Sequence, residues 1–261
     1  MNGAVTRREL LSQPERWQDL IRRASERSWL PKLELEDYDE IILFGSGSSY
    51  YLALLLGELT ERHTGRRVRV LPSCELFLCE DRYLAPYGGR KRLAIGISRS
   101  GESSEALLAA DVLEKHGVPL LALGCVADSS LLEKAGERLL IPEGREDGMV
   151  MLRSFTAMAL GFQLFLDPAA PERLEGLPDK GERLLQSCAE PLKRLANRAD
   201  FRRFVVLGSG LAYPLALEAA LKFQEMAIVT TEAYHSLEYR HGPKSTAGAD
   251  TLLVLFALED K

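Results

Sequence analysis

Three charged side chains recur at helical spacing in an otherwise apolar segment near the C-terminal end of the sequence. Glu218, Lys222 and Glu225 occupy positions i, i+4 and i+7, so we expect them on one face of an α-helix. A carboxylate beside a cation can move a proton between two adjacent carbons while the cation stabilises the oxyanion that develops. The simpler interpretation is a solvated Glu–Lys pair worth about 0.2–0.5 kcal/mol.

The loop after this segment favours the chemical interpretation. Residues 236–244 read Ser-Leu-Glu-Tyr-Arg-His-Gly-Pro-Lys and bring acidic, cationic and imidazole side chains together around His241. Such a concentration is unusual for a structural connection, because functional side chains are often carried on loops. We expect this loop to fold back toward the helix that carries Glu225.

Two serine-rich stretches in the N-terminal half could hold an anion. Each follows an apolar run and precedes a helical segment, and the candidate residues are Gly47, Ser48 and Ser49 in the first stretch and Ser98, Ser100 and Ser103 in the second. Backbone N–H groups at a helix N-terminus attract phosphate, and hydroxyl groups add donors. Helix capping explains one such stretch, but two at the same sheet edge favour a phosphate or sugar-phosphate site.

A dinucleotide site is the main alternative for the first glycine-rich loop. The fingerprint GxGxxG needs a third glycine, but Tyr50 stands at that position after Gly45 and Gly47, and the loop at Gly208 lacks it as well. No acidic residue ends the second strand at 71–73, and no Walker loop is present. The pattern therefore disfavours a nicotinamide site.

Short apolar runs alternate with helical segments along the chain. The predicted strands are Glu40–Phe44, Arg67–Leu71, Leu93–Ile97, Leu120–Leu123, Arg138–Ile141 and Phe204–Leu207. The predicted helices are Glu15–Trp29, Tyr50–His63, Met149–Leu166, Lys180–Arg198 and Ala212–Met226. Continuous apolar strands separated by helices predict an α/β fold with a doubly wound parallel sheet covered on both faces.

The opening pattern returns in the second half of the chain. Residues 42–47 (ILFGSG) and 205–210 (VVLGSG) align without gaps, and both open a strand–loop–helix arrangement. We interpret this as an internal repeat. The second copy has room for two or three strands, against about five in the first, so we expect either a truncated chain or completion of the fold by another subunit.

These patterns predict four regions. The predicted regions are an N-terminal helical segment (1–38), a first α/β domain (39–168), a linker helix (169–199) and an apparently incomplete second domain (200–261). The stretch 168–179 carries three prolines and is expected to be a connector.

Composition excludes several function classes. The chain is 46% hydrophobic and 27% charged, which disfavours disorder, and its net charge of −5 disfavours a nucleic-acid surface. Residues 1–30 are rich in Arg, Glu and Gln, so we expect no secretory signal there, and the longest apolar run is too short to span a bilayer. The four cysteines and four histidines lack metal-site spacing, so we expect reduced thiols in a cytoplasmic protein without metal or redox cofactor.

The order of the motifs resembles the SIS (sugar isomerase) family. Motifs seen in that family are matched by residues 47–50 (GSSY), 98–103 (SRSGES), 217–225 (LEAALKFQE) and 240–243 (RHGP). The resemblance covers about 39–261 and extends to the isomerase half of glutamine–fructose-6-phosphate aminotransferase, to SIS-type glucosamine-6-phosphate deaminases and to tagatose-6-phosphate ketose/aldose isomerases. It implies a flavodoxin-like three-layer αβα fold.

The resemblance also implies roles for the candidate residues. The two serine stretches would hold a 6-phosphate, and Glu225 would be the base that moves a proton between C1 and C2. Lys222 and Glu218 would assist, and His241 would help to open the sugar ring, often from a neighbouring subunit. Met151 and Arg153 depart from the serine and lysine of that family.

Three functions follow as expectations. The first is deamination with isomerisation of an amino-sugar 6-phosphate, such as glucosamine 6-phosphate, to the ketose 6-phosphate and ammonia. The second is ketose–aldose isomerisation without deamination. The third is a non-catalytic phosphosugar sensor, which would not need the Glu218, Lys222, Glu225 and His241 set.

We expect a homodimer that binds a small sugar phosphate and neither nucleic acid nor membrane. The resemblance implies that the glutamine-hydrolysing domain of the aminotransferases has no counterpart before residue 39, and we expect the family's C-terminal tail to lie beyond Lys261.

Overall fold

Five parallel strands form the sheet of the N-terminal part in the computed structural model, which describes residues 3–85, 89–198 and 200–258. The strands are β1 (Glu40–Gly45), β2 (Arg67–Pro72), β3 (Arg92–Ile97), β4 (Leu120–Gly124) and β5 (Glu137–Leu140). Their order is β2-β1-β3-β4-β5, and every neighbouring pair is parallel. This is the doubly wound α/β arrangement predicted from the sequence.

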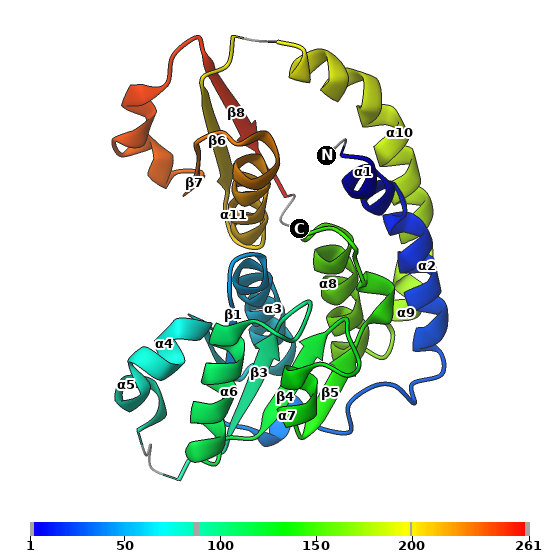
Figure 1. Ribbon diagram of the computed structural model, residues 1–261, viewed down its shortest axis with the longest axis vertical. Helices are drawn as coiled ribbons and strands as arrows, with labels where there is room; N and C mark the ends of the chain where they lie inside the picture. Colours follow the sequence, from blue (N-terminus) through cyan, green and yellow to red (C-terminus); the bar gives the residue numbers. More distant parts are fainter. Residues whose placement is uncertain (1–2, 86–88, 199, 259–261) are drawn as a thin grey trace. The chain divides into compact units, whose positions relative to one another are not determined.

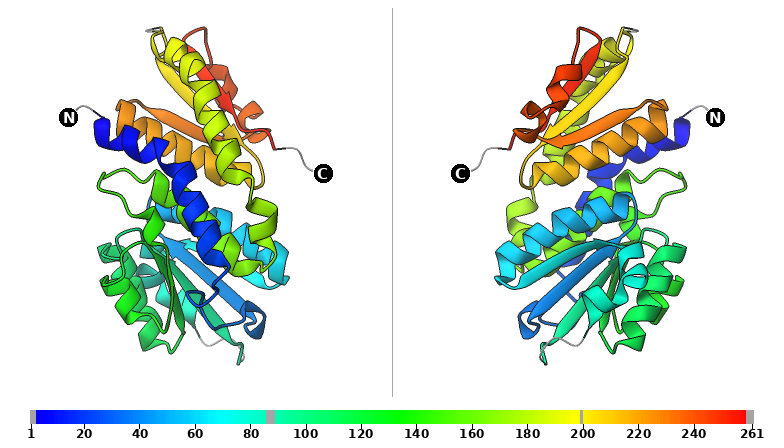
Figure 2. Two further views of the ribbon diagram at one scale, coloured as in Figure 1. Left: turned by 90° about the vertical axis from the view of Figure 1, so that its right-hand side faces the viewer. Right: turned by 90° about the vertical axis from the view of Figure 1, so that its left-hand side faces the viewer.

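Helices cover both faces of this sheet (Figures 1 and 2). One face packs against α4 (Ser73–Leu78), α5 (Glu80–Leu84), α6 (Ser104–Lys115) and α7 (Ser130–Lys134). The other carries α3 (Ser48–Thr64) and α8 (Arg153–Leu166), with α2 (Gln13–Ala24) packed on α8. All six residues of β1 are buried. Burial on both faces explains why the strands are continuous apolar runs.

The chain divides into two compact units at residues 182 and 183, and the second unit contains a smaller sheet. Its strands are β6 (Arg203–Gly208), β7 (Thr231–His235) and β8 (Thr251–Leu255), all parallel in the order β7-β6-β8. This order repeats β2-β1-β3 of the first unit. Within the described residues the second sheet therefore contains the first three strands of the repeat.

The two glycine loops of the repeat have the same local geometry. A side chain at Gly45 would lie 2.5 Å from the backbone of Ser49, and one at Gly208 would lie 2.2 Å from the carbonyl oxygen of Ala212. Two residues later, Gly47 and Gly210 have φ of +57° and +56°, which favours glycine. The turn between each strand and the following helix therefore has room only for glycine.

Several predicted boundaries are corrected. The first predicted helix ends at Ala24 and not at Trp29, and α8 begins at Arg153 and not at Met149. An additional helix, α1 (Ala4–Leu11), precedes α2. The segment predicted as a connector before the helix at 180–198 contains α9 (Ala170–Leu174) and the start of α10 (Leu177–Ala196). Pro171 and Pro178 stand in the first turns of these helices, where a missing N–H costs no hydrogen bond.

Five shorter turns complete the described elements. They are the 3-10 turns η1 (Leu35–Asp37), η2 (Pro142–Gly144), η4 (Glu238–Arg240) and η5 (Pro243–Thr246), and the π-helical turn η3 (Phe223–Ala227) that extends α11 (Ala212–Lys222). Among the helices described here, none is both long enough and apolar enough to cross a membrane.

Candidate functional site

The two serine stretches lie at the carboxyl ends of adjacent strands. The first follows β1 and the second follows β3, and these strands pair in register from Glu40 with Arg92 to Phe44 with Gly96. The chain leaves β1 toward β2 on one side and later returns to β3 on the other. The loops therefore flank the point where the strand order reverses, which is where open α/β sheets bind their ligands.

The second stretch is ordered by its own hydroxyl groups. Ser98 is 2% exposed, and its Oγ accepts the N–H of Gly101 at 3.0 Å and lies 3.3 Å from Oγ of Ser103. Ser100 Oγ accepts the N–H of Glu102 at 3.2 Å. Ser98 thus shapes the loop from inside, while Ser100 and Ser103 are only half-buried. Ligand contact is therefore better suited to the latter two residues.

Side-chain capping does not account for the serines. Ser103 is the N-cap residue of α6, yet its side chain makes no capping hydrogen bond. The N-cap of α3 is Gly47, which has no side chain to cap with. The N-termini of both helices therefore retain the positive end of the helix dipole without a neutral cap, as an anion site requires.

Ser48 and Ser49 belong to the first turn of α3 and not to the preceding loop. Both are buried, with 6% of their surface exposed. The hydroxyl of Ser49 contacts Sδ of Met151 at 3.7 Å. Arg153 turns elsewhere, because its guanidinium donates to Oγ of Ser12 at 2.8 Å. Met151 and Arg153 are the two positions that depart from the motifs of the resembled family. Met151 therefore borders the sheet edge that carries the two serine stretches, here called the serine edge, whereas Arg153 binds the N-terminal segment.

The predicted acid–base set is brought together around Lys222 in the second unit. Its Nζ lies 3.2 Å from Oε1 of Glu218 and 2.5 Å from Oε2 of Glu225. The side chains of Glu218 and Lys222 are 9% and 15% exposed, and that of Glu225 is 36% exposed. A buried carboxylate thus holds the ammonium group, and a more accessible carboxylate stands on its other side.

A change of helix type gives Glu225 its position. The predicted single helix is α-helical only to Lys222 and continues as the π turn η3. Gln224 ties this turn to β7 by donating from Nε2 to the carbonyl oxygen of Thr231 at 2.9 Å. Ile228 follows at φ +55°, a strained value for a β-branched residue. Such π turns often occur at functional sites.

His241 does not fold back onto the Glu225 helix within the same unit, so that expectation is wrong. Tyr239 in the adjacent turn η4 packs on Val205 and Leu207, whereas α11 packs on Val206. Successive side chains of a strand point to opposite faces. The segment that carries His241 and the helix that carries Glu225 therefore cover opposite faces of the sheet, and His241 is exposed.

The predicted residues thus form two groups. The serine stretches belong to the first unit, and Glu218, Lys222, Glu225 and His241 belong to the second. Within the described part of the chain, no group of three or more His, Cys, Asp or Glu side chains could hold a metal ion.

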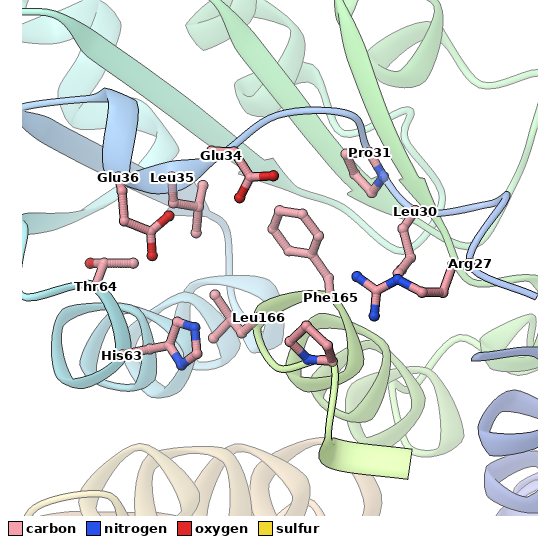
Figure 3. A pocket seen from close by; sticks show the side chains of 11 residues that line it. Arg27, Leu30, Pro31, Glu34, Leu35, Glu36, His63, Thr64, Phe165 and Leu166 are labelled. Carbon is pink, nitrogen blue, oxygen red and sulfur yellow. The ribbon is translucent and has the colours of Figure 1, made fainter. Parts of the chain in front are cut away.

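A cavity of about 250 Å³ in the first unit lies away from the serine edge (Figure 3). It is lined by His63 and Thr64 at the end of α3, by Phe165 and Leu166 at the end of α8, and by residues of η1. Ser48 stands at the opposite end of α3, which spans about 26 Å at 1.5 Å per residue. This cavity therefore does not belong to the candidate phosphate site.

Sequence reasoning missed two charged residues beside the serine edge. Arg99, between Ser98 and Ser100, donates from Nη1 to the carbonyl oxygen of Gly148 at 2.9 Å. The same nitrogen lies 3.6 Å from Oε2 of Glu146, whose side chain is fully buried. The arginine was visible within the serine motif, but no local pattern marked Glu146 as its partner.

The fold is that of an α/β protein with two parallel sheets: two serine stretches follow neighbouring strands of the first sheet, and a Glu–Lys–Glu cluster lies in the unit of the second. The model of the SIS domain family matches residues 34–166 and 199–261. The chain therefore belongs to the SIS (sugar isomerase) domain family.

Three similar proteins illustrate the relationship. The isomerizing glutamine–fructose-6-phosphate aminotransferase of Gloeobacter violaceus is 30% identical over 240 residues, which cover 86% of this chain and 39% of that protein. The structure of glucosamine-6-phosphate deaminase from Thermotoga maritima is 29% identical with a TM-score of 0.82, over 97% of this chain and 76% of that one. Tagatose-6-phosphate ketose/aldose isomerase from Escherichia coli is 25% identical with a TM-score of 0.84, over 97% and 72%. The chain spans about two fifths of the length of the curated relatives it matches.

Proposed function

We propose that the chain converts an amino-sugar 6-phosphate, such as glucosamine 6-phosphate, to the ketose 6-phosphate with release of ammonia. The observation that carries this proposal is the placement of Lys222 between a buried and a half-exposed carboxylate. The likeness to a glucosamine-6-phosphate deaminase at 29% identity supports the substrate class.

In this proposal the serine edge binds the 6-phosphate. The half-buried hydroxyls of Ser100 and Ser103 and the N–H groups at the start of α6 donate to the phosphate oxygens. Ser98 and Gly47 hold the two loops in shape, and Ser48 and Ser49 complete the edge from the first turn of α3.

Glu225 is the proposed base. Its carboxylate removes the proton from C2 of the open-chain sugar, and a proton is delivered to C1. Lys222 stabilises the negative charge that develops on O1, and Glu218 holds the ammonium group in place. When a proton passes from nitrogen to O1, C1 becomes an alcohol and the C2 amine becomes an imine. Water then adds to the imine carbon, and ammonia leaves to give the ketose.

We also propose that the protein acts as a homodimer with two α/β domains at 39–168 and 200–261. His241 lies on the sheet face opposite the Glu225 helix, so ring opening is assigned to His241 of the partner subunit. A dimer in sedimentation at micromolar concentration supports this assembly, and a strictly monomeric species contradicts it. Cytoplasmic location stays a prediction from the sequence.

Ketose–aldose isomerisation without deamination is the second candidate, supported by the likeness to the tagatose-6-phosphate isomerase. A screen of hexose and hexosamine 6-phosphates, with ammonia and ketose both measured, separates the two. The first proposal predicts equal amounts of ammonia and ketose from glucosamine 6-phosphate. Ketose–aldose interconversion with no ammonia from any hexosamine 6-phosphate would favour the second.

The phosphate site has its own test. We predict that the double variant Ser100→Ala/Ser103→Ala binds glucosamine 6-phosphate more weakly by at least tenfold, because each hydrogen bond to a charged group contributes about 1.5–3 kcal/mol. Ser104→Ala is the matched control, since Ser104 is exposed on the adjacent turn. Calorimetry that gives the same affinity for the folded double variant and the control would exclude this edge as the site.

A further inference from the structure

Helix α1 places the buried carboxylate of Glu9 against the loop 145–152, which borders the serine edge. Glu9 is 1% exposed, and its Oε1 accepts the N–H of Asp147 at 2.7 Å and the N–H of Gly148 at 3.0 Å. A buried carboxylate is costly unless it is hydrogen-bonded. Glu9 therefore has a defined role in fixing this loop, although the proposed chemistry does not use it.

Gly148 connects Glu9 to the serine loop. Its N–H donates to Glu9 on one side, and its carbonyl oxygen accepts from Nη1 of Arg99 on the other. Arg99 stands between Ser98 and Ser100, so the position of Gly148 constrains the side chain at the centre of the serine loop. A single peptide segment is thus held between the N-terminal helix and the candidate phosphate site.

A second buried acid fixes the other end of the same loop. Glu146 accepts the N–H of Leu152 at 2.9 Å and the hydroxyl of Ser154, and its Oε2 lies 3.6 Å from Arg99. Met151, which directly precedes Leu152 in this loop, contacts Ser49. The loop 145–152 therefore meets both serine stretches, and two buried carboxylates determine its shape.

We propose that Glu9 is a positioning residue for the phosphosugar-binding edge and that helix α1 is thereby a functional part of that site. Glu9 touches no ligand in this account. It holds Gly148, Gly148 holds Arg99, and Arg99 holds the serine loop in its binding conformation. The inference rests on the proposed function only in taking this loop as the phosphate site.

The test compares Glu9→Ala with Arg8→Ala. Arg8 belongs to the same helix and contacts the same loop through Asp147, but that ion pair is 63% and 76% exposed and contributes little. Calorimetry with glucosamine 6-phosphate is expected to give about tenfold weaker binding for Glu9→Ala, the equivalent of one charge-assisted hydrogen bond, with unchanged stoichiometry. Arg8→Ala is expected to bind like the parent.

Stoichiometry separates positioning from simple destabilisation, because partial unfolding lowers the number of sites and leaves the affinity of the remainder unchanged. If Glu9→Ala does not fold, Glu9→Gln decides: it keeps an acceptor oxygen but loses the charge, and about threefold weaker binding is expected because neutral hydrogen bonds are about half as strong. Parent-like affinity in the folded Glu9 variants overturns the proposal.

A second readout needs no ligand. Amide hydrogen exchange at residues 100–103 is expected to be faster in the Glu9 variants and unchanged in Arg8→Ala. Unchanged exchange in the Glu9 variants overturns the positioning role even if the parent binds no phosphosugar. Failure of the parent to bind, or an unaffected Ser100→Ala/Ser103→Ala variant, counts instead against the proposed function.

Discussion

Replacing Lys222 by Met separates its role in stability from its role in catalysis. Methionine keeps most of the length of the side chain and removes its charge. In the folded protein this leaves the Glu218 carboxylate, 9% exposed, without the cation 3.2 Å away. Removing one partner of a buried ion pair costs about 3–5 kcal/mol, so we expect a drop of about that size in the free energy of unfolding.

The expected effect on turnover has a different origin. If the ammonium group stabilises the oxyanion by a charge-assisted hydrogen bond worth about 1.5–3 kcal/mol, its removal lowers kcat by about 10- to 150-fold. The double variant Lys222→Met/Glu218→Met removes both buried charges. It is expected to recover most of the stability, because replacing both partners by apolar groups is often neutral, while kcat stays low.

Thermal denaturation and steady-state ammonia release measure the two effects on the same samples. Lys193→Met is the control, because the side chain of Lys193 is 70% exposed and its nearest carboxylate lies 3.9 Å away. Turnover of Lys222→Met within threefold of the parent, together with a stability loss restored in the double variant, would refute the catalytic role and leave Lys222 as a structural partner of Glu218.

Two further predictions concern the first unit. Glu40→Ala is expected to lower the free energy of unfolding by about 3–5 kcal/mol, because Glu40 is buried and its Oε2 lies 3.1 Å from Nε of the 9%-exposed Arg92. The control is Glu58→Ala, whose ion pair with Arg62 is more exposed (29% and 57%) and should contribute less than about 1 kcal/mol. Equal effects of the two variants in urea denaturation would contradict the assignment. The pKa of Glu102 is lowered because its carboxylate accepts the backbone N–H and the hydroxyl of Ser130. These hydrogen bonds to the charged carboxylate stabilise the folded state at a pH above the ordinary pKa of 4.5, and the stabilisation is lost as the pH falls through the lower pKa of the folded state. Melting temperatures of the parent and Glu102→Gln should therefore differ at pH 7 and converge in acid, and a constant difference would contradict this.

Most of the strand core could be predicted because its signal is local. The apolar runs, the glycine turns at Gly45 and Gly208 and the serine motifs are all determined by neighbouring residues. Helix ends were less certain, because residues 25–29 are compatible with a helix in isolation. Prolines explain one error, since Pro171 and Pro178 stand in the first turns of helices, whereas their number in this stretch predicts a connector.

The rest of the site depends on contacts that no local pattern encodes. The π turn at 223–227 has a helix-compatible sequence, and its geometry is tied to a hydrogen bond between Gln224 and β7. His241 lies on the sheet face opposite α11, because η4 packs on Val205 and Leu207 of β6 whereas α11 packs on Val206. Glu9 contacts Gly148 across 139 residues of sequence. Such long-range pairs are a property of the folded chain.

The proposed chemistry depends most directly on Glu225 as the base. Its side chain is 36% exposed and contacts Lys222, so Glu225→Gln should keep the fold and the sugar-phosphate affinity. Loss of a general base costs about 10²–10⁴ in rate, whereas an ordinary surface carboxylate changes stability by about 0.5 kcal/mol or less and leaves turnover intact. Glu190→Gln, 71% exposed in the same unit, is the control.

The decisive measurement is solvent-deuterium exchange at C2 of glucosamine 6-phosphate, followed by NMR with the parent and both variants. We expect exchange by the parent and by Glu190→Gln, and exchange about 10²- to 10⁴-fold slower by folded Glu225→Gln that still binds the sugar phosphate. Exchange by Glu225→Gln at the parental rate would show that Glu225 is not the base and would contradict the proposed mechanism.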